Sequence, residues 1–216
     1  MDTLWSVNII DALADLLLGA QCPGCDEPGW GLCAECVSAL DVTPTIVERP
    51  GVPTIVAANP YRPHLSKIIP RYKDDGALHI EPALSKRLAV AVKALQLPSD
   101  TWLVPIPSRP SAVRTRGFDH AARLAATTAR ATGLRSRRGL RRTSRGSDQL
   151  ELGRASRSQN MHASMRSTMR AGRVVVVDDI VTTGASLAEG IRALEHSGVD
   201  VLAAAVIANV DEPSKK

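Results

Sequence analysis

The residues best suited to chemistry in this sequence are two adjacent acids, Asp178 and Asp179, which directly follow four consecutive valines. An uninterrupted run of β-branched residues predicts a strand that is buried on both faces of a parallel sheet. Open parallel sheets bind their ligands at the carboxyl ends of the strands, which is where the two acids stand. Carboxylates at that place can bind hydroxyl groups or hold a cation such as Mg2+.

Small and hydroxylated residues follow the acids. They are Thr182, Thr183, Gly184, Ala185 and Ser186. A helical pattern then runs from Leu187 to a stop at Gly198, so the turn predicts free backbone N–H groups at a helix N-terminus, which is a site for phosphate. A phosphate site beside two acids that bind hydroxyls or Mg2+ matches a sugar phosphate. In the alternative, the Asp and Thr side chains only cap the helix, but a cap has little need of both acids.

All four cysteines lie within fifteen residues, as Cys22, Cys25, Cys33 and Cys36. Two C-x2-C pairs at this separation are typical of a zinc knuckle or ribbon, in which four thiolates hold one tetrahedral ion. The alternatives are two disulfides, which fit poorly with a chain lacking an export signal, or a redox pair, which would not call for a second pair. We therefore expect a structural Zn2+ with no open ligand position, shielded by Trp30.

The composition is that of a folded protein. The chain has 216 residues, of which 44% are hydrophobic and 23% charged, and this excludes disordered and fibrous classes. No stretch reaches the roughly 18 uncharged apolar residues that a membrane helix needs. Three aspartates interrupt the apolar residues within positions 1–20, so we expect an amphipathic helix of a cytoplasmic protein there rather than a secretory signal.

The charge is unevenly distributed. The net charge is +5, yet residues 109–173 hold 16 Arg against three acids, so the middle of the chain is suited to anions. Its densest part contains Arg135, Arg137, Arg138, Arg141, Arg142 and Arg145. These arginines form either a nucleic-acid surface or a solvated loop. The lone histidines His120 and His162 have no partner at ligand spacing, so solvent or capping roles are expected for them.

The remaining patterns alternate between strands and helices. Strand patterns cover 54–56, 102–104, 174–177 and 199–208, and helical patterns cover 81–97, 118–132 and the residues after the turn. This alternation predicts an α/β fold with a mainly parallel sheet of about five strands flanked by helices. Residues 133–148 are expected to be a basic loop. We expect two parts: a helix and zinc-binding element in residues 1–45, and the α/β domain in residues 46–216.

Residues 176–186, Val-Val-Asp-Asp-Ile-Val-Thr-Thr-Gly-Ala-Ser, resemble the signature of type I phosphoribosyltransferases, which bind 5-phosphoribosyl-1-pyrophosphate (PRPP). Within that superfamily, the chain from about residue 20 to 208 is similar to the competence protein ComF family. The similarity rests on Cys22–Cys36, Tyr72–Gly76, Val104–Pro107, Arg114–Asp119, Gln149 and Arg157–Asn160. It implies the type I phosphoribosyltransferase fold with the zinc element at its N-terminus.

The resemblance also implies roles for single residues. Asp178 and Asp179 would hold the ribose 2- and 3-hydroxyls, directly or through Mg2+, and Thr182, Thr183, Gly184, Ala185 and Ser186 would hold the 5-phosphate. Ser108 and Arg109 stand where the family binds pyrophosphate. 

Further basic positions follow from the same resemblance. Arg114 and Arg116 lie where a mobile loop closes over the reacting centre, and Lys73 is a second basic position that the family shares. Thr182 stands where enzymes acting on 6-oxopurines carry an acid, which argues against such acceptors.

Two classes of function remain open. In the first, the chain is an Mg2+-assisted phosphoribosyltransferase that acts on a nitrogenous acceptor. In the second, it is a non-catalytic ComF-type accessory protein of DNA uptake or processing, which senses PRPP or a nucleotide. Its partners would then be single-stranded DNA, through the Arg-rich segment 135–145, and a helicase-like competence protein.

Overall fold

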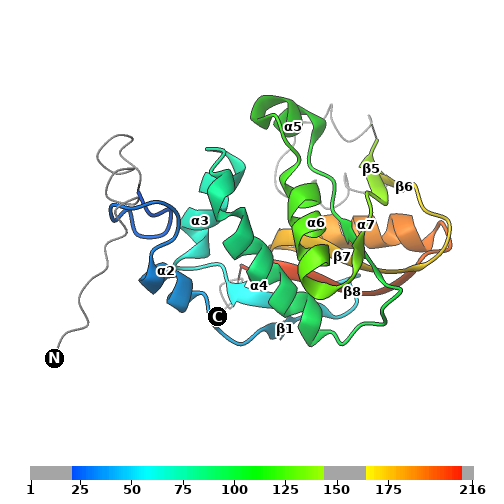
Figure 1. Ribbon diagram of the computed structural model, residues 1–216. Coiled ribbons are helices and arrows are strands. Elements are labelled where there is room, and N and C mark those ends of the chain that lie inside the picture. The colour runs from blue at the N-terminus through cyan, green and yellow to red at the C-terminus, as the bar shows by residue number, and fades with distance from the viewer. Residues whose placement is uncertain (1–20, 144–163, 211–216) are drawn as a thin grey trace, which may run out of the picture.

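The computed structural model describes residues 21–143 and 164–210. Its centre is a six-stranded sheet in the order β1-β2-β8-β7-β3-β4 (Figure 1). The strands are β1 (Thr45–Val47), β2 (Ile55–Pro60), β8 (Asp200–Asn209), β7 (Arg173–Val181), β3 (Trp102–Pro105) and β4 (Arg135–Ser136). All neighbours are parallel except β1, which pairs antiparallel with β2. The expected α/β fold is confirmed, with five parallel strands and β1 as an added edge.

Helices cover both faces of this sheet (Figure 1). On one face lie α3 (Leu65–Lys73), α4 (Glu81–Ala94) and α6 (His120–Thr132). On the other lie α7 (Ala185–Glu195) and the antiparallel pair of β5 (Leu140–Arg142) and β6 (Met165–Ser167). Shorter connecting helices are α2 (Ala34–Ala39), η1 (Leu78–Ile80) and α5 (Pro110–Arg116).

The four valines of β7 are buried because the strand lies between two hydrophobic layers. Val175 and Val177 pack into the layer formed with α4 and α6, whereas Val174 and Val176 pack into the layer formed with α7. Successive side chains of a strand point to opposite faces, so a strand covered on both sides needs an apolar residue at every position.

The direction of the chain reverses between β3 and β7. The connection from β3 leads through α5 and α6 to β4 on one side, and the connection from β7 leads through α7 to β8 on the other. Such a switch point leaves a crevice at the carboxyl ends of the two strands. Pairing between β3 and β7 ends at Pro105 and Val177, while β7 stays paired with β8 as far as Val181. The last four residues of β7 therefore extend beyond β3.

The cysteine-containing segment is attached to α3. The Asp26 carboxylate lies 3.2 Å from the Lys67 ammonium and 2.6 Å from the Arg71 guanidinium. Leu32 packs against the core on the α4 side. The expected division at residue 45 stays a prediction.

Several boundaries differ from expectation. The helix expected over 118–132 begins at His120, because Asp119 caps it by accepting a hydrogen bond from the Ala122 N–H at 3.3 Å. The expected loop 133–148 contains β4 and β5. Helices α3 and α5 were not predicted. Helix α5 has no buried residue and therefore no hydrophobic periodicity.

Some predictions fall on residues outside the described ranges: the helix within 1–20, and the positions Arg145, Arg157, Asn160 and His162. Within the described ranges, no helix is long and apolar enough to cross a membrane.

Candidate functional site

Asp178 and Asp179 lie on the part of β7 that extends beyond β3. The sequence pattern placed them after the end of the strand, but the strand continues through both to Val181. Because successive residues of a strand alternate in direction, Asp179 belongs to the α3 and α6 face and Asp178 to the α7 and β5 face. The backbone N–H of Asp179 donates to Asp178 Oδ1 at 2.9 Å. The pair therefore meets different partners on each face.

Asp179 is only 3% exposed and is surrounded by basic groups. The ammonium of Lys73, the last residue of α3, forms an ion pair with its Oδ2 atom. His120 Nε2, at the start of α6, lies 3.5 Å from the same oxygen. A buried carboxylate needs compensating charge or hydrogen bonds. The Lys73 ammonium supplies the charge, while Oδ2 has no hydrogen-bond partner among the described residues.

His120 connects Asp179 to the loop after β3. Its Nδ1 atom lies 3.2 Å from both Ser108 Oγ and the Arg116 guanidinium. The Ser108 hydroxyl also donates to Asp119 at 2.9 Å. Since Arg116 can only donate, Nδ1 is assigned as the acceptor and the Nε2–H then faces Asp179. Burial, together with the nearby charges of Lys73 and Arg116, lowers the pKa of His120 to about 4. The imidazole is therefore neutral near pH 7, contrary to the expected solvent or capping role.

Asp178 lies in a second charged environment. Burial raises its pKa to about 6, although the positive charges of Lys73 and Arg142 oppose the rise. Arg142 is held in place by a 2.8 Å hydrogen bond from its Nε to the carbonyl of Pro107. Burial and the charge of Arg109 lower the pKa of Arg142, against the effect of Asp178. Arg142 is thus part of the crevice and not of a solvated basic loop.

Four cations lie around the two acids, at the ends of three elements. Lys73 ends α3, Arg109 precedes α5, Arg116 ends α5, and Arg142 ends β5. Burial lowers the pKa of Lys73, an effect that Asp178 opposes and Arg116 adds to. Arg116 also reaches the carboxylate of Asp74 at 2.6 Å, so the ends of α3 and α5 are joined. Arg109 is exposed at the rim. This arrangement can bind a multiply charged anion.

The turn that follows β7 is open to solvent. Thr182 and Thr183 are exposed, and Gly184 is the N-cap of α7 with a φ of 79°. That cap gives no side-chain hydrogen bond to the helix. The Ala188 N–H is the first to bond within the helix, to the Gly184 carbonyl at 2.9 Å. Of the first-turn N–H groups before it, that of Ala185 donates to Thr183 Oγ1 at 3.4 Å. Those of Ser186 and Leu187 have no intrahelical acceptor, so the turn can accept an anion.

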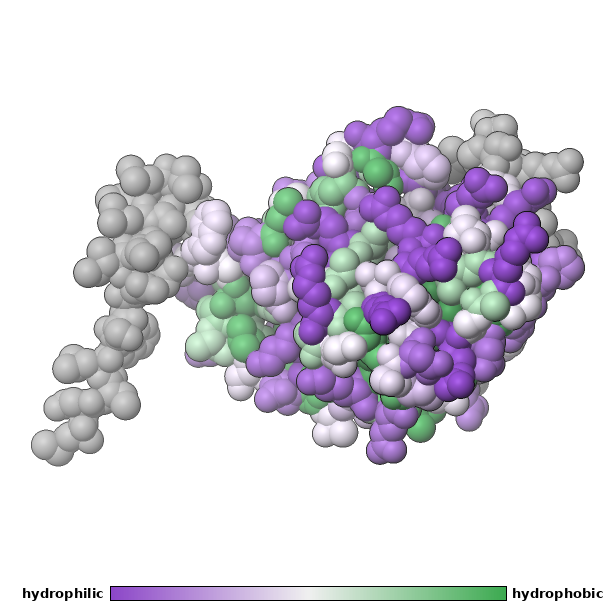
Figure 2. Space-filling model, turned by 45° about the vertical axis from the view of Figure 1, so that its right-hand side comes forward, coloured by the Kyte–Doolittle hydropathy of each residue, from purple (hydrophilic) through white to green (hydrophobic). Residues whose placement is uncertain are grey.

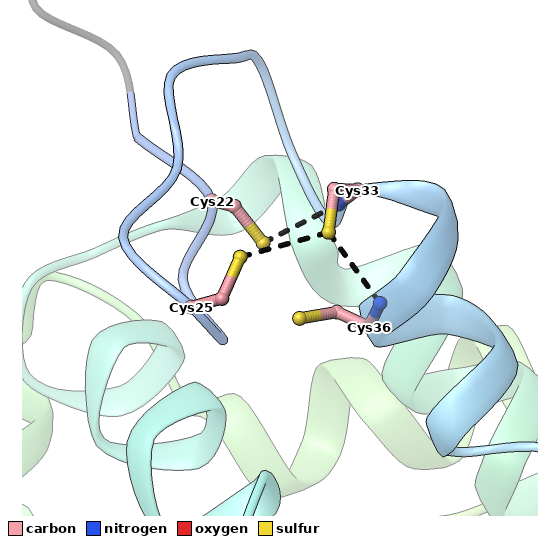
Figure 3. Close-up of side chains that lie close together, drawn as sticks. All are labelled: Cys22, Cys25, Cys33 and Cys36. Atoms are coloured by element: carbon pink, nitrogen blue, oxygen red, sulfur yellow. Dashed lines mark hydrogen bonds between the residues drawn. The ribbon is translucent and has the colours of Figure 1, made fainter.

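The four cysteine sulfurs form a cluster at the other end of α3 (Figure 3). All four ligand atoms lie within 4.8 Å of one another, and none is in a disulfide. Cys33 caps α2 and accepts from the Cys36 N–H at 3.4 Å, while Cys22 accepts from the Cys33 N–H at 3.3 Å. Four sulfurs this close match the tetrahedral Zn–S geometry, so the cluster could bind a metal such as zinc.

The pKa values of the cluster's thiols are consistent with binding of a cation. Burial alone would raise the pKa of Cys22, but hydrogen bonds from the backbone at Cys33, Gly24 and Cys25 bring it down to about 7. Burial and the neighbouring thiols raise the pKa of Cys36. A bound cation removes this mutual repulsion, because metal binding displaces thiol protons. The Trp30 ring, expected as a shield, stacks on His79 with centroids 4.7 Å apart.

The predicted site residues thus gather at one edge of the sheet. Lys73, Ser108, Arg116, Asp178 and Asp179 lie in one connected group. The Thr182–Ser186 turn continues directly from β7, whereas Arg114 is exposed on α5. His120, Arg142, Asp74 and Arg49 also contribute contacts, although no role in the crevice was predicted for them.

Comparison with protein families matches this part of the chain. Residues 114–216 match the family model of the phosphoribosyl transferase domain. These residues, just under half of the chain, are therefore similar to phosphoribosyl transferase domains. The matched residues include α6, β7, the turn and α7, while α3 and the cysteine cluster lie before them. No curated protein matches the sequence.

Solved structures resemble the chain at low identity. UMP synthase from Leishmania donovani is 16% identical with a TM-score of 0.36, over 62% of this chain and 24% of that one. A glutamine PRPP amidotransferase from B. subtilis, complexed with ADP and GMP, is 21% identical with a TM-score of 0.36, over 56% and 25%. Adenine phosphoribosyltransferase from Saccharomyces cerevisiae is 15% identical with a TM-score of 0.39, over 83% and 91%. The chain spans about a quarter of the length of the first two.

Proposed function

We propose that the crevice between β3 and β7 binds PRPP with Mg2+, and that the chain transfers its phosphoribosyl group to a nitrogenous acceptor. One observation carries the proposal. Asp178 and the buried Asp179 lie on β7 between a turn in which Thr182 and Thr183 are exposed and a set of cationic side chains. PRPP has the matching order of groups: a 5-phosphate, ribose hydroxyls and a pyrophosphate. The family match supports phosphoribosyl transfer in general.

Each end of the ligand has a suitable partner. The 5-phosphate would lie on the N–H groups of the Thr182–Ser186 turn, and the hydroxyls at Asp178 and Asp179. The pyrophosphate would meet Ser108 and Arg109 at the start of α5. Lys73, Arg116 and Arg142 stand close enough to the acids to neutralise its charge.

Mg2+ fits the donor set at the acids. Carboxylate oxygens beside hydroxyl and phosphate oxygens are its preferred ligands, and Asp178 and Asp179 would supply them. When bound, Mg2+ would reduce the charge on the pyrophosphate leaving group.

The residues of the crevice suit a reaction with a charged leaving group. In the transfer, the C1–O bond of PRPP breaks and its electron pair leaves with pyrophosphate, while the acceptor nitrogen bonds to C1 and loses its proton. The transition state is oxocarbenium-like, so positioned cations and anchored hydroxyls matter more than a strong nucleophile. Arg109, Arg116, Arg142 and Lys73 would stabilise the departing charge, and Asp179 would orient the ribose.

The acceptor is proposed to be a nitrogenous compound other than a 6-oxopurine. Thr182 is the first residue of the turn and is exposed, and its hydroxyl cannot act as the base that such acceptors use in similar enzymes. We therefore expect no transfer to hypoxanthine, guanine or xanthine.

Titration calorimetry with PRPP and Mg2+ tests the proposal. The wild-type chain should bind, and the double variant Asp178→Asn/Asp179→Asn should not. Asp100→Asn, which changes an exposed acid paired with Arg173, is the matched control and should bind like wild type. A wild-type chain without binding would refute the proposal.

Turnover is tested separately. Incubation with PRPP, Mg2+ and a panel of bases should release pyrophosphate with an accepted base and none with the three 6-oxopurines. Binding without release from any base would instead favour a sensor. Release with a 6-oxopurine would show that the acceptor assignment is wrong.

A second candidate is the ComF-type accessory role, in which the chain contacts single-stranded DNA beside a helicase-like partner. The observation that favours it is a set of exposed arginines: Arg130, Arg135, Arg137, Arg138, Arg141 and Arg166. No acid occurs between residues 120 and 143 or between 164 and 177. Hydrophilic side chains cover much of the molecule when its β5 and β6 side is brought forward (Figure 2).

Gel-shift assays across a salt series test this role. Contacts between arginine and phosphate should weaken steeply as salt rises. Replacing Arg135, Arg137, Arg138 and Arg141 by Ser should abolish the shift, while Arg62→Ser, far from this set in sequence, should not. An absent or salt-independent shift would refute DNA contact.

A further inference from the structure

Arg49 lies in the link between β1 and β2, yet it contacts the turn after β7. Its Nε–H donates to the Thr182 carbonyl at 2.6 Å, across 133 residues of sequence. One Nη donates to Asn209 Oδ1 at 2.8 Å and to the Val210 carbonyl at 3.1 Å, at the end of β8. The other Nη donates to the Glu48 carbonyl at 2.8 Å. Most of the donors of this guanidinium are therefore used on protein acceptors.

The side chain of Arg49 also packs directly on Gly184. A Cβ atom at position 184 would lie 2.7 Å from Arg49 Cβ and 3.0 Å from Arg49 Cγ. The φ of 79° at Gly184 already disfavours other residues. Two features therefore require glycine at position 184: the left-handed backbone conformation, and the aliphatic part of Arg49, which fills the space where a side chain would lie.

The hydrogen bond to Thr182 fixes the direction of a peptide plane. In a planar trans peptide, the C=O and the following N–H point in opposite directions. Because Arg49 holds the Thr182 carbonyl toward itself, the N–H of Thr183 points away from Arg49. Thr183 is exposed, so this N–H is presented to the open side of the turn, where an anion would lie.

We propose that Arg49 is a positioning residue for the phosphate site: it orients the Thr182–Thr183 peptide and fixes the turn against the end of β8 without itself holding the phosphate. This inference rests on the proposed function, because it assigns a device to the 5-phosphate end of the PRPP site. It predicts that the phosphate end and the pyrophosphate end of the crevice respond differently to changes at residue 49.

The test compares two ligands that each use one end of the crevice. Ribose 5-phosphate and inorganic pyrophosphate are titrated separately, with Mg2+, into wild type, Arg49→Lys and Arg49→Ala. Arg49→Lys keeps the charge and most of the stem on Gly184, so it retains the packing that folding needs. A single ammonium cannot reproduce a planar fork with divergent donors.

Both variants should bind ribose 5-phosphate at least about tenfold more weakly, the usual range for losing a group that orients a binding residue. Pyrophosphate binding should stay within about twofold, which also shows that the variant is folded. Added guanidinium ion should restore part of the loss in Arg49→Ala. Arg170→Ala, at an exposed arginine on the opposite end of β7, should leave both ligands unchanged.

The outcomes separate this inference from the function on which it rests. A wild-type chain that binds neither ligand would overturn both. If wild type binds and the variants lose both ligands equally, or neither, only the role of Arg49 is refuted. Full retention of ribose 5-phosphate binding in Arg49→Lys would likewise refute orientation, because it would show that positive charge alone is sufficient.

Discussion

The cysteine cluster and the crevice differ in how their side chains are brought together. The cluster takes its four sulfurs from Cys22 to Cys36, a single short segment. The crevice takes its charged groups from α3, the loop after β3, α5, α6, β5 and β7. Local spacing is enough to recognise the first, whereas the second exists only after the sheet has formed. The cluster can therefore assemble within one segment, whereas the crevice requires the folded sheet and its helices.

The two regions also differ in their electrostatics. The cluster collects groups of one kind. Burial and the neighbouring thiols raise the pKa of Cys36, and a bound cation would relieve this. The crevice mixes acids and bases, so Lys73, His120 and Asp179 compensate one another without any added ion. Metal removal should thus unfold the cysteine cluster and leave the charge interactions of the crevice largely unchanged.

The largest expected effect concerns the cluster. Chelation should remove a bound metal whose contribution to folding is on the order of 10 kcal/mol. Cys25→Ser tests the same point with little loss of packing, because Cys25 is exposed. It should abolish stoichiometric zinc and lower the melting temperature more than any crevice variant. Zinc content and thermal unfolding are the measurements. An unchanged melting temperature would mean that the cysteines hold no structural metal.

The next effect concerns His120 and acid. Its pKa is about 4 in the folded chain against 6.5 in the unfolded one, so the unfolded state binds more protons between these values. Stability should therefore fall as pH drops from about 6.5 to 4, by about 2 to 3 kcal/mol from this group. His120→Gln, which can still accept from Arg116 and donate to Asp179, should lack this part of the loss.

Urea unfolding at a series of pH values, without ligand or Mg2+, measures the difference between His120→Gln and wild type. Superimposable pH profiles would show that the imidazole does not titrate in this window. His79→Gln serves as the control at another histidine whose pKa burial lowers, and its profile should differ less, since no cationic neighbour adds to the effect there.

Asp178 should affect the pH dependence of stability with the opposite sign to His120. Its folded pKa of about 6 lies above the ordinary 3.8, so its contribution to stability is lost as pH rises through that window. Asp178→Asn should then stabilise the unliganded chain at pH 7.5 by about 3 kcal/mol, and should do little for stability below pH 4. The same variant should weaken PRPP binding. Urea unfolding at both pH values checks this, and destabilisation at pH 7.5 would contradict it.

The smallest effect belongs to a surface pair outside both regions. Arg173 and Asp100 lie 3.2 Å apart with 48% and 63% of their side chains exposed. Exposed pairs of this kind contribute little, so Asp100→Asn should change stability by less than about 0.5 kcal/mol. A larger change in urea unfolding would mean that this end of β3 and β7 is more strongly coupled than the two regions compared above.

The sequence predicted those parts of the fold and site whose pattern is local. The valine run, the acids after it and the Gly-containing turn indicated the sheet edge, and the C-x2-C pairs indicated the sulfur cluster. The alternation of Asp178 and Asp179 between two faces could not be seen, because nothing in four valines and two acids marks where the strand ends.

Contacts between elements that are distant in the sequence could not be predicted from it. Arg142 looked like one of a run of surface arginines, and its place beside Asp178 depends on where β5 packs. His120 looked isolated because its partners Ser108, Lys73 and Asp179 come from other elements. No sequence pattern marked Arg49, because its partners are mostly backbone carbonyls, which every residue has.

Helix α3 is attached at both the cysteine segment and the crevice. Lys67 and Arg71 hold Asp26, while Lys73 reaches Asp179. Lys67 and Lys73 are about 9 Å apart along the axis, and a short helix moves as a rigid body. Loss of the structure around the cysteines would therefore free Asp26 from this helix and leave the ion pair between Lys73 and Asp179 in place.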